Sequence, residues 1–197
     1  MLQKIVLASE NPGKIREIQA ILDDRPIVPQ SRFHTPEVEE TGLTFVENAI
    51  IKARNAARFS GLPAIADDSG LAVDALDGAP GIFSARYAGP GSSDQANLEK
   101  LINTLAGVSD NRRTARFICV IVFMRHENDP CPIIAQGVWE GLILNEPRGS
   151  NGFGYDPVFL VPEEACSSAE LTPEHKNRVS HRAKALRGLA EQLRSLK

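Results

Sequence analysis

Cysteine is scarce in this sequence, and the cysteines that it has form no recognisable pattern. Cys119, Cys131 and Cys166 are odd in number and show no C-x-x-C spacing. Neither a disulfide framework nor a zinc site is therefore predicted. Because so little cysteine is typical of proteins in a reducing compartment, we expect a cytoplasmic location.

Long apolar runs and a strong excess of one charge are also missing. No stretch reaches the roughly 18 apolar residues of a transmembrane helix, and the run from Lys4 to Ala8 is too short for a signal peptide. No membrane partner is therefore expected. The net charge of −3 argues against broad binding of nucleic acid. The motifs H-E-x-x-H and G-x-S-x-G are absent as well.

The residues that are present have the balance of an ordinary folded protein. Of the 197 residues, 42% are hydrophobic and 24% are charged, which excludes a disordered, collagen-like or coiled-coil chain. A chain of this length is expected to form one domain with a sizeable core.

Helical and strand patterns alternate along the chain. A capping box at Thr44 and Glu47 predicts a helix that ends at Gly61. The patterns predict strands over 4–8, 63–66, 71–73, 115–124 and 133–144, a turn over 67–70, and helices after Pro12, over 93–105 and over 179–196. Residues 26–36 are expected to be irregular, and the two long strands to form an antiparallel hairpin. The predicted fold is therefore α/β with a mixed sheet flanked by helices.

The turn between the first strand and the first helix is a candidate phosphate site. It consists of Ser9, Glu10, Asn11, Pro12, Gly13 and Lys14. Amides at a helix N-terminus, together with a lysine, suit a phosphate group. The sequence is not a Walker A loop, and a capped helix with a solvated lysine explains the same residues.

Acidic residues in two segments form a candidate metal site. Asp67 and Asp68 lie in the predicted turn, and Glu39 and Glu40 lie in an acidic loop over 37–42. Magnesium needs only one or two carboxylates when phosphate oxygens supply other ligands. The alternative is a turn whose acids are solvated.

A glycine-rich loop and a basic cluster complete the set of candidate sites. The loop contains Phe153 and Tyr155 between glycines, so that a nucleobase could stack on either ring unless the rings pack into the core. The basic cluster over 176–182 begins the last helix, where cations oppose the helix dipole unless an anion is bound. A solvated basic face is the alternative.

Taken together, these motifs closely resemble the inosine triphosphate pyrophosphatase family. The resemblance covers essentially the whole chain and is most specific in Ala66–Gly70, Gly152–Pro157 and Ser180–Arg182. It implies a single domain over residues 1–197 with an elongated mixed sheet and two lobes around a central active-site cleft. It also implies a homodimer that needs Mg²⁺ and cleaves ITP, dITP and XTP to the monophosphate and pyrophosphate.

The resemblance also implies roles for individual residues. Asp68 matches the catalytic acid and a magnesium ligand, and Glu39 matches the second metal ligand, although Glu40 is adjacent. The substrate-binding positions are matched by Ser9, Glu10, Asn11, Pro12, Gly13, Lys14, Ser69, Phe153, Gly154, Tyr155, Asp156, Lys176, His181 and Arg182. Of these, Lys176, His181 and Arg182 are candidate donors to the 6-oxo group of the purine. Glu10 departs from the usual glycine and places an acidic side chain in the triphosphate loop.

Two other functions use part of the same evidence. A purine nucleotide-binding regulator without turnover would keep the phosphate loop and the aromatic residues, but would not need the acidic pair. An RNA-binding module is disfavoured by the net charge and by the absence of an RNP-like motif.

Overall fold

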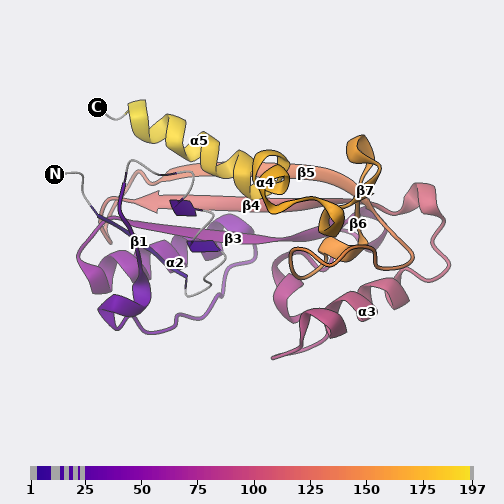
Figure 1. Ribbon diagram of the computed structural model, residues 1–197. Helices are drawn as coiled ribbons and strands as arrows, with labels where there is room; N and C mark the ends of the chain where they lie inside the picture. The colour runs from indigo at the N-terminus through magenta and orange to yellow at the C-terminus, as the bar shows by residue number, and fades with distance from the viewer. Residues whose placement is uncertain (1–3, 10–13, 16–17, 20–21, 23–24, 196–197) are drawn as a thin grey trace. The chain divides into compact units, whose positions relative to one another are not determined.

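The computed structural model describes residues 4–9, 14–15, 18–19, 22 and 25–195 of the chain (Figure 1). It divides into two compact units. The first unit comprises residues 1–68, 119–137 and 182–197, and the second comprises residues 69–118 and 138–181. No helix among the described residues is long and apolar enough to cross a membrane.

The described residues form a sheet in the order β2-β1-β3-β4-β5-β6-β7. Strand β1 is parallel to β2 and β3, whereas β6 is antiparallel to β5 and β7, so the predicted mixed sheet is confirmed. Residues 125–132 join the neighbouring strands β4 and β5, which is too short for a parallel crossover and supports the predicted hairpin. The strands are β1 (Ile5–Leu7), β2 (Ile27–Pro29), β3 (Ala64–Val73), β4 (Thr114–Met124), β5 (Ile133–Ile143), β6 (Phe159–Val161) and β7 (Cys166–Ser167).

The predicted turn over 67–70 is wrong, because β3 runs without interruption from Ala64 to Val73. Two acids, a serine and a glycine favour a turn when only local preferences count. Here Asp67 and Asp68 are 2% and 8% exposed, and the cations described below compensate their charges. Tertiary contacts therefore override the local preference.

The segment 26–36 also contains more regular structure than expected. Ile27–Pro29 forms β2, whose residues pair with Ile5–Leu7, and a short 3₁₀ helix follows over Gln30–Phe33. Strand β2 lies at the end of the strand order. A proline, which has no N–H group, is tolerated there because no further strand needs a hydrogen-bond donor on that side.

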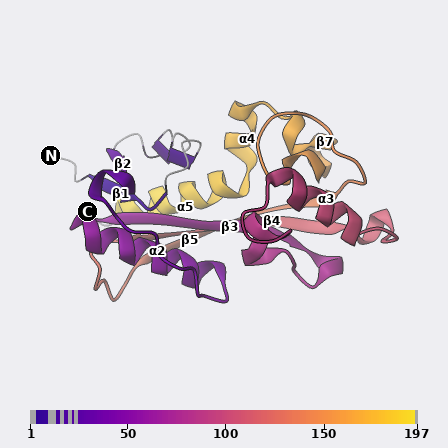
Figure 2. The ribbon, with the colours of Figure 1, turned by 90° about the horizontal axis from the view of Figure 1, so that it is seen from below.

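In the first unit, helices α2 (Phe45–Ser60) and α5 (His181–Ser195) lie on opposite faces of the strands (Figures 1 and 2). Helix α5 packs Leu186, Leu189 and Leu193 against alternate residues of β4. Helix α2 begins at the predicted N-cap Thr44 and ends at Gly61, which adopts φ 65°. Its buried face consists mainly of alanines, whereas Phe59 is 46% exposed.

In the second unit, helix α3 (Asp94–Thr104) lies within the predicted range 93–105, and Ser93 is its N-cap. Leu98, Leu101 and Leu105 pack in one core cluster with aromatic residues such as Phe117 and Phe159. A further helix, α4 (Pro173–Val179), precedes α5 and was not predicted from the sequence. The predicted glycine-rich loop leads into a short 3₁₀ helix, Asp156–Val158.

Candidate active site

The two neighbouring acids of β3 point to opposite faces of the sheet in the first unit. Successive side chains of a strand alternate in direction, so Asp67 shares a face with Ile65, which packs in the α5 cluster. Asp68 shares the other face with Ala66 and contacts residues of α2. One dipeptide therefore supplies a carboxylate to each side of the sheet.

Asp67 is held between two cations. Lys14 Nζ lies 3.0 Å from Asp67 Oδ1 and 2.9 Å from Oδ2, and Arg182 Nε at the start of α5 lies 3.5 Å from Oδ2. Burial raises the pKa of Asp67, but the charges of Lys14, Arg182 and Lys52 outweigh burial and hold that pKa far below its usual range. Asp67 therefore stays ionised and keeps Lys14 and Arg182 close to β3.

Asp68 shares one ammonium group with the acidic loop. Lys52 Nζ on α2 lies 2.8 Å from Asp68 Oδ1 and 2.9 Å from Glu40 Oε1, and Asn48 Nδ2 lies 3.5 Å from Asp68 Oδ2. Burial raises the pKa of Asp68 above its usual value, although Lys52 opposes the rise. Burial lowers the pKa of Lys52, but its acidic neighbours raise it overall.

Two residues in these contacts, Lys52 and Glu40, had no predicted role or only a secondary one. Lys52 had no predicted role, and the structure places Glu40 against it, whereas Glu39 is exposed. The spacing of Asn48 and Lys52, four residues apart on a helix whose other inward positions are alanines, was the available signal. Polar residues on a buried helix face need partners.

In the second unit, the glycine-rich loop is built around the buried carboxylate of Asp156. It accepts hydrogen bonds from the Phe153 N–H group at 2.8 Å and from the Ser168 hydroxyl at 2.8 Å, and it pairs with Lys176. Gly152 adopts φ +79°, and a Cβ there would lie 2.1 Å from Asp156 Oδ2. Only glycine therefore fits at this turn.

The two aromatic residues of the loop have different environments. Phe153 is 50% exposed, and Lys176 Nζ lies 5.3 Å from the centre of its ring. Tyr155 is 5% exposed, and its hydroxyl donates to the Ser84 carbonyl at 2.8 Å. Phe153 therefore exposes half of its side chain, to which a ligand has access, whereas Tyr155 belongs to the core.

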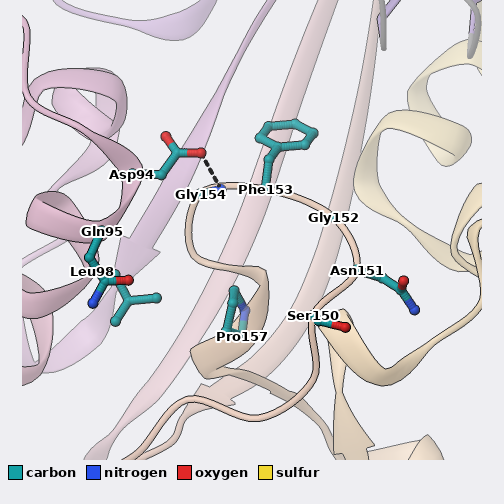
Figure 3. Close-up of a pocket in the computed structure, with 9 residues that line it drawn as sticks. All are labelled: Asp94, Gln95, Leu98, Ser150, Asn151, Gly152, Phe153, Gly154 and Pro157. Carbon is teal, nitrogen blue, oxygen red and sulfur yellow. Dashed lines mark hydrogen bonds between the residues drawn. The ribbon is translucent and has the colours of Figure 1, made fainter.

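A pocket of about 170 Å³ lies beside this loop, next to the N-terminus of α3 (Figure 3). Asp94 accepts a hydrogen bond from the Gly154 N–H group at 2.8 Å and so ties the loop to the helix. In Figure 3 the Phe153 ring extends away from Ser150 and Pro157, which lie at the other end of the pocket.

The remaining predicted site residues are less informative. The His181 ring stacks on Phe117 with centroids 4.8 Å apart and lies 6.4 Å from the Trp139 ring. Ser9 and Ser69 are half-buried. The predictions for Glu10, Asn11, Pro12 and Gly13 lie outside the described residues, so that of the phosphate loop only Ser9 and Lys14 are described.

The carboxylates that face Lys52 fit a small divalent cation. Asp68 and Glu40 each place an oxygen within 3 Å of the same nitrogen, so one cation at that point could contact both. Among the described residues, no three acidic, histidine or cysteine side chains form a complete metal cage. This sparse set is suited to Mg²⁺, which takes its other ligands from water and phosphate.

An α/β protein with two strand carboxylates set among lysine and arginine side chains is suited to bind an anion together with a metal. Residues 5–192 match the model of the Ham1 family. The chain therefore belongs to the Ham1 family.

Individual relatives agree with this assignment. A dITP/XTP pyrophosphatase of Vibrio parahaemolyticus serotype O3:K6 (strain RIMD 2210633) is 61% identical over 98% of this chain and 97% of its own length. One of Vibrio vulnificus (strain YJ016) is 60% identical over 98% of each chain. The solved structure of a HAM1 protein from Coxiella burnetii has a TM-score of 0.94 and 53% identity, and the match covers 99% of this chain and 100% of that one. The family resemblance predicted from the sequence is confirmed.

Proposed function

We propose that this protein hydrolyses the non-standard purine nucleotides dITP, XTP and ITP to the monophosphate and pyrophosphate. The relatives named dITP/XTP pyrophosphatase support this function, since they match almost the whole chain. The observation that carries it is that the two neighbouring acids of β3 have different surroundings, which shift their pKa values in opposite directions. The pKa of Asp67 is lowered by its cations and that of Asp68 is raised by burial, which is the pattern expected when one carboxylate balances charge and the other accepts a proton.

The first unit carries the groups that act on the triphosphate. Lys14, Lys52 and Arg182 supply positive charge around β3, and phosphoryl transfer depends mainly on positioning and charge neutralisation. Asp68 accepts a proton at its carboxylate from the water that attacks the α-phosphorus.

We assign Mg²⁺ to Asp68 together with an acid of the 39–40 pair. Glu40 is favoured over Glu39, because Glu40 already shares Lys52 with Asp68. A bound Mg²⁺ neutralises charge on the phosphate oxygens. Lys52, which contacts both acids, would supply further positive charge beside the ion and the phosphates.

The second unit carries the groups that recognise the base. Phe153 offers an exposed ring for stacking, and Lys176 beside it is a candidate donor to the 6-oxo group. His181 remains a second candidate donor. Arg182 belongs to the first unit, where it pairs with Asp67, so we assign it to charge balance and not to base recognition. The assignment of a homodimer follows the family resemblance, and that of a cytoplasmic location follows from the scarcity of cysteine.

The test is a panel of nucleotides with Mg²⁺, in which pyrophosphate and nucleoside monophosphate are both measured. We expect dITP, XTP and ITP to release pyrophosphate and monophosphate in equal amounts, and ATP to react much more slowly. Binding of these nucleotides without any release would favour the regulator. Release of orthophosphate and a diphosphate would contradict cleavage between the α- and β-phosphates.

A further inference from the structure

The acidic segment, defined here as residues 36–43, is fastened along α2 by successive polar contacts. Asn55 Nδ2 donates to the Pro36 carbonyl at 2.8 Å, and Lys52 pairs with Glu40 at 2.9 Å. The Gly42 N–H group donates to Asn48 Oδ1 at 2.8 Å. As the segment advances, its partners step back along the helix by three or four residues, about one turn each. Segment and helix therefore run in opposite directions.

Asn48 is placed to join this segment to β3, the strand that carries Asp68. Its side chain is fully buried on α2. Since the Gly42 N–H group needs an acceptor, the amide oxygen of Asn48 faces the segment and its NH₂ group faces Asp68 Oδ2 at 3.5 Å. One rigid amide therefore spans the two elements that carry Glu40 and Asp68.

We propose that Asn48 is a positioning residue that sets the distance between the acidic segment and Asp68, and thereby the affinity of the two carboxylates for a divalent cation. The inference rests on the proposed function only in that it takes a cation to bind there. Partners that orient metal ligands typically contribute 10–100-fold to metal affinity.

Gly42 provides an independent way to disturb the same spacing. A Cβ at this position would lie 2.5 Å from Glu47 Cβ and 2.7 Å from Asn48 Oδ1. Gly42→Ala therefore pushes the segment away from α2 without removing any polar group of the site. Asn55→Ala is the matched control, because it also removes a tie between the segment and α2, but at Pro36.

The experiment measures the binding of Mn²⁺, a spectroscopic probe for Mg²⁺, to the full chain without nucleotide by electron paramagnetic resonance. We expect Asn48→Ala and Gly42→Ala to raise the dissociation constant about tenfold or more, and Asn55→Ala to change it less than twofold. The Mg²⁺ concentration for half-maximal pyrophosphate release should rise in the same two variants, while kcat at saturating Mg²⁺ changes less.

Other outcomes contradict the proposal. Unchanged Mn²⁺ affinity in Asn48→Ala, or equal weakening by Asn55→Ala, would overturn it. If Asn48→Ala fails to fold, Gly42→Ala decides, and wild-type affinity in that variant would overturn the inference. Wild-type protein that binds no Mn²⁺ would also overturn it. Wild-type protein that binds Mn²⁺ but releases no pyrophosphate would refute the proposed function instead.

Discussion

At the scale of single residues, Asp67 and Asp68 show how the same side chain acquires two different properties. Both are buried on β3, yet Asp67 faces Lys14 and Arg182, whereas Asp68 faces Lys52 and the acid Glu40. The surroundings lower the pKa of Asp67 and raise that of Asp68. Substitution of Asp68 should therefore mainly lower activity, whereas substitution of Asp67 should mainly lower the free energy of unfolding.

Asp68→Asn should abolish most activity while it leaves the fold intact. The substitution removes the proton acceptor, and general bases typically contribute 10²–10⁴-fold to the rate, so we expect kcat for pyrophosphate release to fall at least about 100-fold. The free energy of unfolding should change little, because the cost of burying the charge of Asp68 offsets the stabilisation from its ion pair with Lys52.

A surface acid near the end of the same strand provides the control for this prediction. Asp74 follows β3 and pairs with Arg116, and its side chain is 44% exposed. Asp74→Asn should keep kcat within about twofold, since surface substitutions away from a site have small effects. If Asp68→Asn were as active as this control, Asp68 would not be the proton acceptor.

Asp129 should make stability depend on pH. Its carboxylate accepts hydrogen bonds from the N–H group and guanidinium of Arg125 and from the Cys131 N–H group. These bonds, led by the side chain of Arg125, hold the pKa of Asp129 well below its usual range. Because the folded-state pKa is depressed, this stabilisation is complete above the unfolded pKa of about 4 and is lost as the pH falls towards the folded value.

We therefore expect Asp129→Ala to lower the free energy of unfolding by roughly 1–3 kcal/mol at pH 7 and by clearly less at pH 3. The value should lie towards the lower end, because half of the Arg125 side chain is exposed. Urea denaturation at both pH values measures the difference. Glu127→Ala, in the same segment between β4 and β5, is the control and should have little effect at either pH. A loss that does not depend on pH would argue against the charge of Asp129 as its cause.

At the scale of elements, β3 is where prediction from the sequence failed and where the site lies. Residues 67–70 have the composition of a turn, and only their distant partners explain why they form a strand. The cations come from residues 14, 52 and 182, and no local pattern connects these positions to β3. Had the strand been recognised, its alternation would have assigned Asp67 and Asp68 to opposite faces.

Elements whose signals are local were predicted correctly. Thr44 accepts a hydrogen bond from the Glu47 N–H group, as the capping box predicts, and the Glu47 carboxylate accepts hydrogen bonds from the Leu43 N–H group and the Thr44 hydroxyl. Gly61 ends α2. The long strands β4 and β5 were found because β4 is apolar almost throughout and β5 contains several β-branched and aromatic residues. Strand β2, with three residues, was too short to show a pattern.

Asp67→Asn tests the role of β3 as an anchor for two cations. The substitution keeps the shape of the side chain but removes the negative charge that faces Lys14 and Arg182. Breaking a buried ion pair typically costs about 3–5 kcal/mol, so urea denaturation should show a loss approaching this range, in contrast to Asp68→Asn. If both variants were equally stable, the cations of Asp67 would not hold β3 in place.

At the scale of the whole molecule, the residues proposed for the two parts of the substrate belong to different units. Residues proposed to act on the triphosphate, such as Lys14, Lys52 and Asp68, belong to the first unit, and Phe153 and Lys176 belong to the second. The sequence separated these motifs correctly, because each lies in a distinct segment. It grouped Arg182 with Lys176 from their closeness in sequence, whereas the structure pairs Arg182 with Asp67 of the first unit.

This division predicts how substitutions alter the choice of base. ITP should exceed ATP in kcat/KM by at least about 100-fold, because a donor placed for a 6-oxo group finds no acceptor in a 6-amino group. Lys176→Ala removes such a donor and should lower ITP hydrolysis more than ATP hydrolysis, which narrows the ratio of their kcat/KM values.

Phe153→Ala should lower both activities by similar factors, since stacking contributes roughly 1–3 kcal/mol for any base. Arg182→Ala should do the same, because its partner is Asp67. Steady-state kinetics with both nucleotides measure the ratio, and a ratio that falls with Arg182→Ala but not with Lys176→Ala would return base recognition to Arg182.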